Sequence, residues 1–181
     1  MHKKSVVAAL SVLVFSLLAS ADSQWGLQQS TIRYSASHPL HHFQGISHAA
    51  RGKGVCQAGE CQFLIAVPVK SFDSGDSNRD LHMLQATRGA QYPMVMVRTQ
   101  VPEADIKPGT IHADLQVQFS GQTVNYKRLP FQVTMQGKDV RLTGTVPATL
   151  TDFKITPPTL LTIPIKNEIP VQVDMTWSPG S

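Results

Sequence analysis

The strongest constraint on this chain is an alternation of apolar and polar residues that recurs in many short runs. The longest run sets apolar residues on one face against polar residues on the other: Ile111, Ala113, Leu115, Val117 and Phe119 against His112, Asp114, Gln116 and Gln118. Because successive side chains of a β-strand point to opposite faces, a period of two predicts a strand with one buried face. We therefore expect an all-β protein.

Similar runs follow one another along most of the chain, separated by short segments rich in Gly, Pro and polar residues. They predict about seven or eight antiparallel strands, each with one apolar face. Closing such a sheet on itself removes its edges and gives all apolar faces one interior, so we expect a β-barrel of about eight strands. A two-sheet β-sandwich is the alternative. A break in the alternation near Lys127 predicts a change of phase in one strand.

The segment Val69–Pro93 is the one stretch with helical character. Ser77-Asn-Arg-Asp80 resembles a capping box with Asp in place of the usual Glu, and Asp76 is an alternative N-cap. Leu81 and Leu84 lie three residues apart, which predicts one short helix with a narrow apolar face turned toward the barrel interior. We expect this helix to cover the barrel and to shape the entrance to its interior.

Residues 1–21 have the pattern of a secretory signal peptide. A basic start is followed by the apolar run Val6–Leu18 and by Ala19-Ser20-Ala21, so cleavage is expected after Ala21, leaving a domain over residues 22–181. The apolar run is short for a membrane crossing and no later segment is long and uncharged enough to span, so we expect no stable membrane span. A retained anchor is the alternative. Export to the periplasm is the expected destination.

The charge balance argues against nucleic acid as a partner. Two of the 16 basic residues, Lys3 and Lys4, lie in the signal segment, so 14 basic and 12 acidic side chains remain in the expected mature domain. No cluster of Lys and Arg with interleaved aromatic residues accompanies this near balance. The sequence leaves the assembly open between a monomer and a homodimer.

The two cysteines, Cys56 and Cys61, flank Gln57-Ala-Gly-Glu60 between two strand-like runs. A four-residue loop with Gly brings its flanking residues opposite one another, so we expect a disulfide that pins a hairpin in an oxidising compartment. A redox centre is the alternative, but the CxxxxC spacing lacks the CxxC geometry that tunes a thiolate.

The order and spacing of three groups of motifs resemble the YceI-like family of bacterial periplasmic proteins. These are Val69-Lys-Ser71-Phe-Asp-Ser-Gly75 with Asn78-Arg-Asp80 and Tyr92-Pro93, then Gly109-Thr-Ile-His-Ala-Asp-Leu115 with Ser120-Gly121, and finally Asp152-Phe-Lys-Ile-Thr-Pro-Pro158. The resemblance implies an extended lipocalin-like barrel whose interior tunnel holds a long isoprenoid or a related amphiphile. Apart from such a bound lipid, no cofactor is expected.

The tunnel lining follows if the larger apolar face of each strand points inward. With Leu81 and Leu84 of the helix, it would comprise Phe63, Ile65, Val95, Val97, Leu115, Val117, Phe119, Phe131, Val133, Val171 and Val173. Such a lining favours burial of a hydrocarbon tail by about 0.8 kcal/mol per methylene. We therefore predict non-enzymatic carriage or sequestration of a long apolar lipid of the polyprenyl, quinone or fatty-acyl type. The alternative is that the same side chains fill a solid core.

Arg79 and Asp80 form a conspicuous charged pair next to the expected helix start. We expect a structural role, in which Asp80 caps the helix and Arg79 ties it to the sheet. The alternative is that Arg79 contacts a polar headgroup of the ligand.

The His-rich segment His38–His48 suggests a second function, that of a periplasmic metal-binding or stress-response interaction module. His38, His41 and His42 could bind Zn or Cu. Pro39 makes a helical arrangement of these residues unfavourable, and the segment contains no carboxylate or Cys, so we expect no metal site. Gly-x-Ser-x-Gly, HExxH and phosphate-binding Gly loops are absent from the sequence, so an enzyme is not expected either.

Overall fold

The computed structural model describes residues 23–160 and 162–180, so the signal peptide expected over residues 1–21 lies outside the described residues. The long strands are β1 (Ser23–His38), β2 (His41–Ser47), β3 (Arg51–Gln57), β4 (Glu60–Pro68), β5 (Met94–Pro102), β6 (Gly109–Phe119), β7 (Gln122–Gln136), β8 (Asp139–Thr149) and β11 (Glu168–Pro179). The remaining elements are one helix, α1 (Ser77–Ala86), a hairpin of β9 (Thr159–Leu160) and β10 (Ile163–Pro164), and the 3₁₀ turns η1 (Val69–Ser71), η2 (Glu103–Asp105) and η3 (Thr151–Phe153). Within these residues, no helix has the length and apolar character that a membrane crossing requires.

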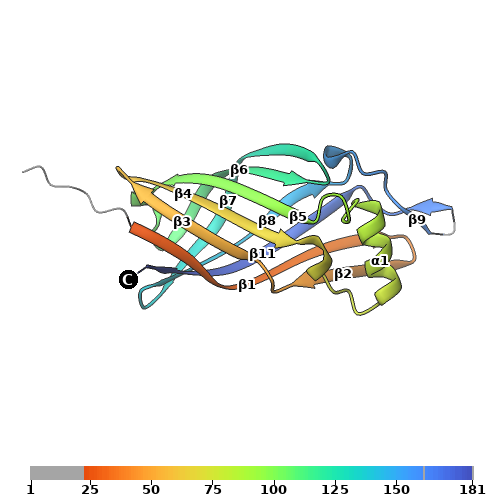
Figure 1. The fold of residues 1–181 in the computed structure, drawn as a ribbon, viewed down its shortest axis with the longest axis horizontal. Helices are drawn as coiled ribbons and strands as arrows, with labels where there is room; N and C mark the ends of the chain where they lie inside the picture. The colour runs from red at the N-terminus through yellow and green to blue at the C-terminus, as the bar shows by residue number, and fades with distance from the viewer. Residues whose placement is uncertain (1–22, 161, 181) are drawn as a thin grey trace, which may run out of the picture.

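The long strands form one antiparallel sheet that closes on itself (Figure 1). Strands β3 to β8 pair in chain order, and β11 pairs with both β8 and β1. β2 and β3 together act as one interrupted strand, because their pairing offset with β1 is the same at Ile32–Ser47 and at Gly26–Lys53. The fold is therefore an eight-stranded antiparallel barrel, as the alternation predicts, and the two-sheet sandwich is wrong.

The alternation in the sequence becomes the inside and outside of the barrel wall. In β6, from Ala113 to Val117, every second residue is buried and the intervening polar residues are exposed. The predicted change of phase is a bulge in which Lys127 and Arg128 stand opposite Asp114. The Asp114 carboxylate accepts hydrogen bonds from the Arg128 amide at 2.8 Å and from Lys127 Nζ at 2.7 Å. This bulge keeps apolar side chains of β7 facing inward on both sides of it.

The β3–β4 hairpin carries the expected disulfide between Cys56 and Cys61. The two cysteines are direct partners in the ladder, and both are buried. The predicted four-residue loop is wrong, because Gln57 and Glu60 also pair. The remaining two-residue turn, Ala58-Gly59, has positive φ values of 53° and 83°, a geometry that matches the twist of the flanking strands.

Helix α1 lies across one end of the barrel, in the connection from β4 to β5 (Figure 1). Its N-cap is Asp76, whose carboxylate accepts hydrogen bonds from the amides of Asn78 and Arg79 at 2.9 and 3.1 Å. The alternative cap is thus the one that forms, and the predicted capping box is wrong. Asp80 instead accepts hydrogen bonds from the amide and the hydroxyl of Ser74, at 3.1 and 2.6 Å. Asp80 therefore holds the loop that leads into the helix.

Both ends of this helical connection are fastened to the barrel. Before the helix, Ile46 and Asp73 exchange two backbone hydrogen bonds of 2.9 Å. After it, Arg88 donates from Nε to the hydroxyl of Ser120 at 3.2 Å and from its terminal nitrogen to the Ser120 carbonyl. Ser120 lies in the β6–β7 turn and is fully buried. These contacts fix α1 against the strands on either side of it.

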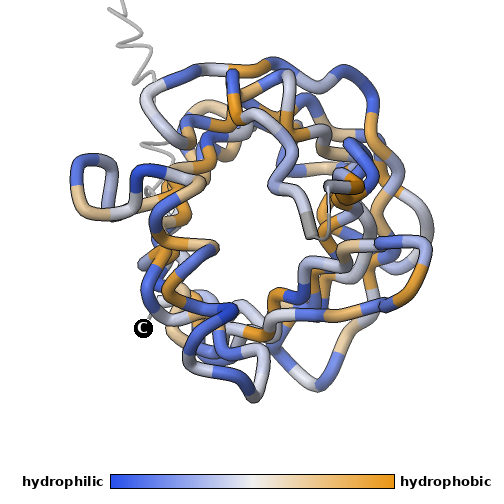
Figure 2. Tube along the Cα trace, turned by 90° about the vertical axis from the view of Figure 1, so that its right-hand side faces the viewer, coloured by the Kyte–Doolittle hydropathy of each residue, from blue (hydrophilic) through white to orange (hydrophobic). Residues whose placement is uncertain are grey.

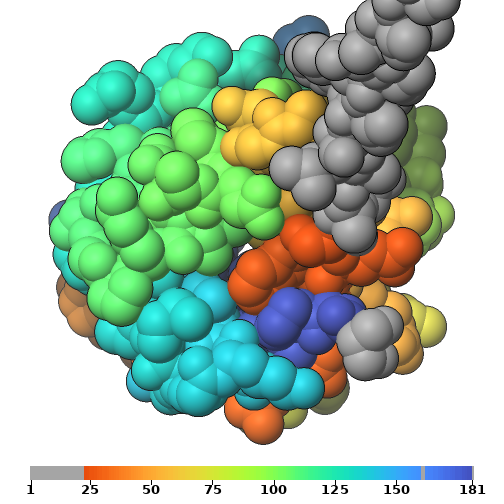
Figure 3. All heavy atoms as spheres, turned by 90° about the vertical axis from the view of Figure 1, so that its left-hand side faces the viewer, coloured from red at the N-terminus to blue at the C-terminus, as the bar shows by residue number. Residues whose placement is uncertain are grey.

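The two ends of the barrel differ in structure. We call the end with α1, the β1–β2 turn and the β9–β10 hairpin the helix end (Figure 1). The opposite end, with the β3–β4 and β7–β8 turns and η2, is the disulfide end. Figure 3 views this end, where side chains from the start of β1, the β5–β6 connection and the β7–β8 turn come together outside the area that grey atoms cover.

Candidate functional site

The barrel contains a cavity of about 760 Å³, within the range of roughly 300–1,000 Å³ that is typical of small-molecule sites. Its walls are inward-facing side chains of most of the long strands, and α1 contributes at the helix end. Figure 2 looks into the barrel from that end, with the chain wound around the interior as a ring. Most of the lining is aliphatic or aromatic. This geometry suits an apolar molecule better than a charged one.

All eleven strand residues of the predicted lining border this cavity: Phe63, Ile65, Val95, Val97, Leu115, Val117, Phe119, Phe131, Val133, Val171 and Val173. All of them lie in β4 to β7 or in β11, at positions whose side chains point into the barrel. The barrel brings them together because closure turns every apolar face toward one axis. Their contact with a ligand stays a prediction.

The inward side chains do not fill the interior. Val95, Val97, Val171 and Val173 border the cavity and yet are only half-buried. In a close-packed core each of these valines would be covered by neighbouring side chains on all sides. The partial exposure of inward-facing aliphatic residues therefore indicates an open interior and argues against the solid core.

The helix turns a different face to the cavity from the predicted one. Leu81 is 52% exposed, and neither Leu81 nor Leu84 borders the cavity in the described structure. Leu84 covers Gly89, where an added Cβ would lie 2.7 Å from Leu84 Cδ2. The residues of α1 that border the cavity are Asn78, Arg79, His82, Met83 and Ala86. The inward orientation of the two leucines is therefore wrong, because the helix lies over an open end and presents a largely polar face to it.

Large aromatic side chains line the cavity toward the disulfide end. The rings of Phe63 and Trp177 meet edge to face with centroids 5.0 Å apart. Both rings lie against glycines of β3, since a Cβ on Gly54 would be 2.4 Å from Phe63 and one on Gly52 would be 2.5 Å from Trp177. Trp177 and Trp25 are lining residues that the predicted set omits. The alternating glycines of β3 are the sequence signal that could have revealed them.

The charged lining lies at the helix end. Among the described residues that border the cavity, Arg79 is the one Lys or Arg and Asp76 is the one Asp or Glu. Their side chains pair at 3.4 Å, and the guanidinium lies 5.2 Å from the ring centre of Phe43. Hydrogen bonds from the Arg79 amide, and then from the Asn78 amide, lower the pKa of Asp76. Arg79 thus links the helix start to β2 and also borders the cavity, so both predicted roles remain open to test.

The three predicted metal candidates also lie at the helix end. His38, His41 and His42 all border the cavity. His38 is 2% exposed, and its ring stacks with that of His41 at a centroid distance of 6.4 Å. His42 Nδ1 instead shares a hydrogen bond of 3.0 Å with the Ser37 hydroxyl. In the part of the chain that the structure describes, these imidazoles do not join a group of three donor atoms with metal-site spacing.

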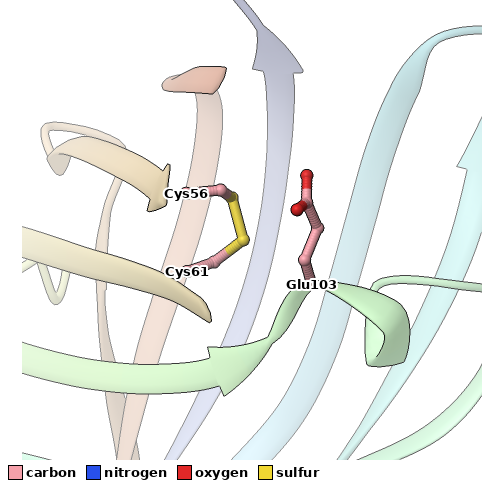
Figure 4. A group of neighbouring side chains, drawn as sticks. All are labelled: Cys56, Cys61 and Glu103. Carbon is pink, nitrogen blue, oxygen red and sulfur yellow. A yellow bond between two sulfur atoms is a disulfide. The ribbon is translucent and has the colours of Figure 1, made fainter. Parts of the chain in front are cut away.

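One such group does occur, at the disulfide end. Cys56, Cys61 and Glu103 bring their donor atoms within 4.8 Å of one another (Figure 4). The two sulfur atoms are bonded to each other, so no thiolate is present to ligate an ion. The Glu103 carboxylate accepts a hydrogen bond of 3.4 Å from the Ser23 hydroxyl. The group is therefore a disulfide beside a carboxylate at the junction of β1, β3 and β4.

Comparison with solved structures shows the same barrel in other bacterial proteins. A polyisoprenoid binding domain from Saccharophagus degradans, implicated in plant cell wall breakdown, is similar with a TM-score of 0.71 and 14% identity, over 86% of this chain and 98% of that domain. BcnA from Burkholderia cenocepacia gives a TM-score of 0.67 and 13% identity, over 81% of this chain and 95% of its own. The YCEI protein of Campylobacter jejuni gives 0.51 and 12%, over 98% and 94%. At these identities the likeness shows the fold.

Comparison at the level of sequence is more specific. No curated protein matches the chain. The YceI-like domain, however, matches residues 25–177, a range that begins in β1 and ends in β11 and so includes the whole barrel and α1. The match includes the segment from Val69 to Pro93, which holds the first of the three groups of motifs. A closed eight-stranded barrel, one helix across its end and a sequence match over nearly all of the described residues agree, and the chain belongs to the YceI-like family.

Proposed function

We propose that this protein binds a long apolar lipid in the barrel interior and carries or sequesters it without a catalytic step. The observation that carries the proposal is the cavity of about 760 Å³, which aliphatic and aromatic side chains of most of the barrel strands line. The similar domain from Saccharophagus degradans is a polyisoprenoid binding domain, which supports a polyprenyl tail as one candidate. Quinone and fatty-acyl tails are the other candidates. Domains of the YceI-like family generally bind rather than catalyse.

The cavity predicts how affinity should depend on tail length. Each methylene moved from water into such a lining contributes about 0.8 kcal/mol, roughly a four-fold change in Kd. With roughly 30 Å³ for a group the size of a water molecule, the cavity takes up about 25 such groups. The gain is partly offset by the ordering of the tail and the loss of its free motion. Affinity should therefore rise with tail length and level off once the cavity is filled.

Native mass spectrometry of the full chain, purified from its host without detergent, tests this function. We expect a discrete mass increment that organic extraction releases as a lipid, and renewed uptake of long-chain lipids by the extracted protein. A folded protein that retains no lipid and takes up none after extraction would refute the proposal.

A matched pair of variants in β5 adds a control. Val97 borders the cavity, whereas its neighbour Arg98 is exposed on the outer face. Val97→Gln should weaken binding by about ten-fold, because the amide enters an apolar cavity without a hydrogen-bond partner. Arg98→Gln should leave binding unchanged. Equal effects of the two variants would contradict binding inside the barrel.

We also propose that the protein acts in the periplasm. The pattern of residues 1–21 supports export, and the Cys56–Cys61 disulfide suits an oxidising compartment. Sequencing of the protein from a periplasmic fraction should find an N-terminus at Asp22. An intact Met1 on protein confined to the cytoplasm would show that this part of the proposal is wrong.

A further inference from the structure

The cavity reaches the surface at the helix end. Among the described residues that line it, those that are exposed to solvent all belong to that end. They come from the start of β2, from the helical connection and from the segment that enters β9, and they include His41, His42, Asn78, His82, Pro158 and Thr159. We call these six residues the rim. Toward the disulfide end the lining residues, such as Trp25, Phe63 and Val101, are buried or half-buried, so the rim marks the opening of the cavity.

Each of the three segments that form the rim carries one large apolar side chain in contact with solvent. Leu40 directly precedes His41, Leu81 directly precedes His82, and Ile163 lies in β10, which pairs with β9. Their exposed fractions are 59%, 52% and 42%. None of the three borders the cavity in the described structure, so a ligand inside the barrel would not cover them. A single exposed leucine is ordinary, but three such side chains around one opening indicate a surface that meets something apolar.

A long apolar tail needs an apolar acceptor at this opening. Each methylene that leaves the cavity for water weakens binding by roughly four-fold, so release of a whole tail into water is strongly opposed. At a bilayer surface, the leading methylenes enter the hydrocarbon core while the trailing ones are still inside the barrel, and little of the tail meets water. The opening is the part of the barrel where such contact would ease transfer.

The composition of the helix end fits a bilayer better than a protein partner. The three aliphatic side chains are separated by the opening and by polar rim residues, so they do not form the continuous apolar core of a stable protein interface. A bilayer surface accepts such a mixture. Aliphatic side chains reach the acyl boundary there, while amphipathic side chains such as those of His41 and His82 remain at the level of the headgroups. Figure 1 shows α1, the β1–β2 turn and β9 together at this end of the barrel.

We propose, resting on the lipid-binding function above, that the helix end docks on a lipid bilayer through Leu40, Leu81 and Ile163 and exchanges its ligand there. In the docked protein the opening faces the membrane, so the tail passes between the cavity and the bilayer along the barrel axis. Three side chains provide a short-lived contact and not a stable anchor, because lasting attachment needs a larger buried apolar area. The protein can therefore leave the membrane once the ligand has moved.

The test follows the transfer of cis-parinaric acid, an intrinsically fluorescent fatty acid, from loaded full-length protein to vesicles. The vesicles consist of phosphatidylethanolamine and phosphatidylglycerol and carry an energy acceptor. Docking predicts a transfer rate that rises in proportion to vesicle concentration, because encounters with the bilayer limit the rate. Release into water predicts a rate that does not depend on vesicle concentration, because dissociation then precedes uptake by the vesicle.

A triple variant, Leu40→Gln with Leu81→Gln and Ile163→Gln, removes the apolar contacts. At a given vesicle concentration its transfer rate should fall by at least about ten-fold, because three aliphatic side chains no longer enter the bilayer. Its affinity for the fatty acid should stay unchanged, since none of the three side chains borders the cavity. The control is Val55→Gln with Met135→Gln, which changes two exposed apolar side chains near the disulfide end and should transfer at the wild-type rate.

A wild-type rate that is independent of vesicle concentration, or equal rates for the triple variant and the wild type, would overturn docking and leave lipid binding intact. The first of these results needs no variant and stands even if the triple variant does not fold. A triple variant that converts a dimer to a monomer and leaves transfer unchanged would identify a second copy as the occupant of this surface, and would also overturn the proposal. If the folded wild type takes up no cis-parinaric acid and retains no lipid from its host, lipid binding itself is wrong.

Discussion

Filling the cavity near its disulfide end should shorten the tails that the protein accepts. Ala113 lies in β6, is 5% exposed and borders the cavity. The strand register sets Gln100 opposite Asp114 and Val101 opposite Cys61, so Ala113 lies beside Val101 in the half of β6 nearer the disulfide end. Ala113→Phe adds a phenyl ring to the cavity wall in that half of the barrel. The variant therefore probes the length of tail that the cavity admits.

The size of the effect follows from the volume that the ring takes. A phenyl ring occupies the space of about six methylenes, worth up to about 5 kcal/mol of tail burial at about 0.8 kcal/mol each. For a tail long enough to fill the wild-type cavity, this is an upper limit of roughly 4,000-fold in Kd. A tail shorter by about six carbons loses nothing. Because the ring enters an open cavity, the stability cost should stay within the 1–3 kcal/mol that is typical of added core volume.

The assay is a series of fatty-acyl probes of increasing length, titrated against delipidated wild type and variant. We expect the affinity of Ala113→Phe to level off about six carbons earlier than that of the wild type. Gln116→Phe, exposed on the outer face of the same strand, should reproduce the wild-type curve. Superimposable curves for a folded Ala113→Phe and the wild type would show that the tail does not reach the disulfide end.

Two further predictions concern stability. Reduction of the Cys56–Cys61 disulfide should lower the free energy of unfolding by about 2 kcal/mol, because the closed loop is short, and should lower Tm by about 4–8 °C. Calorimetry with and without reductant measures this change. An unchanged Tm after verified thiol release would contradict the prediction. Burial raises the pKa of Tyr126 to about 12 from 10.0, so the unfolded chain loses this proton first and stability should fall as pH rises from about 10 to 12. Denaturant titrations should show a shallower fall in Tyr126→Phe, and parallel falls would refute the assignment.

The barrel wall was predictable because the burial of apolar side chains explains both the alternation within each strand and the closure of the sheet. A strand with one apolar face must bury that face, so the parity of residues such as Leu115 and Val171 settles which way they point. The bulge at Lys127 was visible for the same reason, as a break in that parity. The interior lining could thus be written down from β-periodicity before the order of the strands in the sheet was known.

The rest of the site was not predictable from apolarity. Leu81 and Leu84 were expected to face inward because burial of leucine is favourable, but the end of an open cavity is wet, and there α1 turns Arg79 and His82 to the interior. The burial of His38 in the β1–β2 turn, where its ring accepts a hydrogen bond from the Leu40 amide, is likewise invisible to periodicity. Local periodicity predicts which face of an element is apolar, and it does not predict where the tertiary structure leaves space.

The two fastenings of the helical connection limit how a ligand can come and go. The Ile46–Asp73 pairing anchors the connection before α1, and the Arg88–Ser120 contacts anchor it after the helix. We therefore expect α1 to stay in place across the end of the barrel and not to open as a lid. A bound tail must then leave along the barrel axis, past α1. Each added methylene lengthens the stretch of tail that is exposed to water during withdrawal. Residence time should therefore grow with tail length up to the length that fills the cavity, and the change should lie in the dissociation rate.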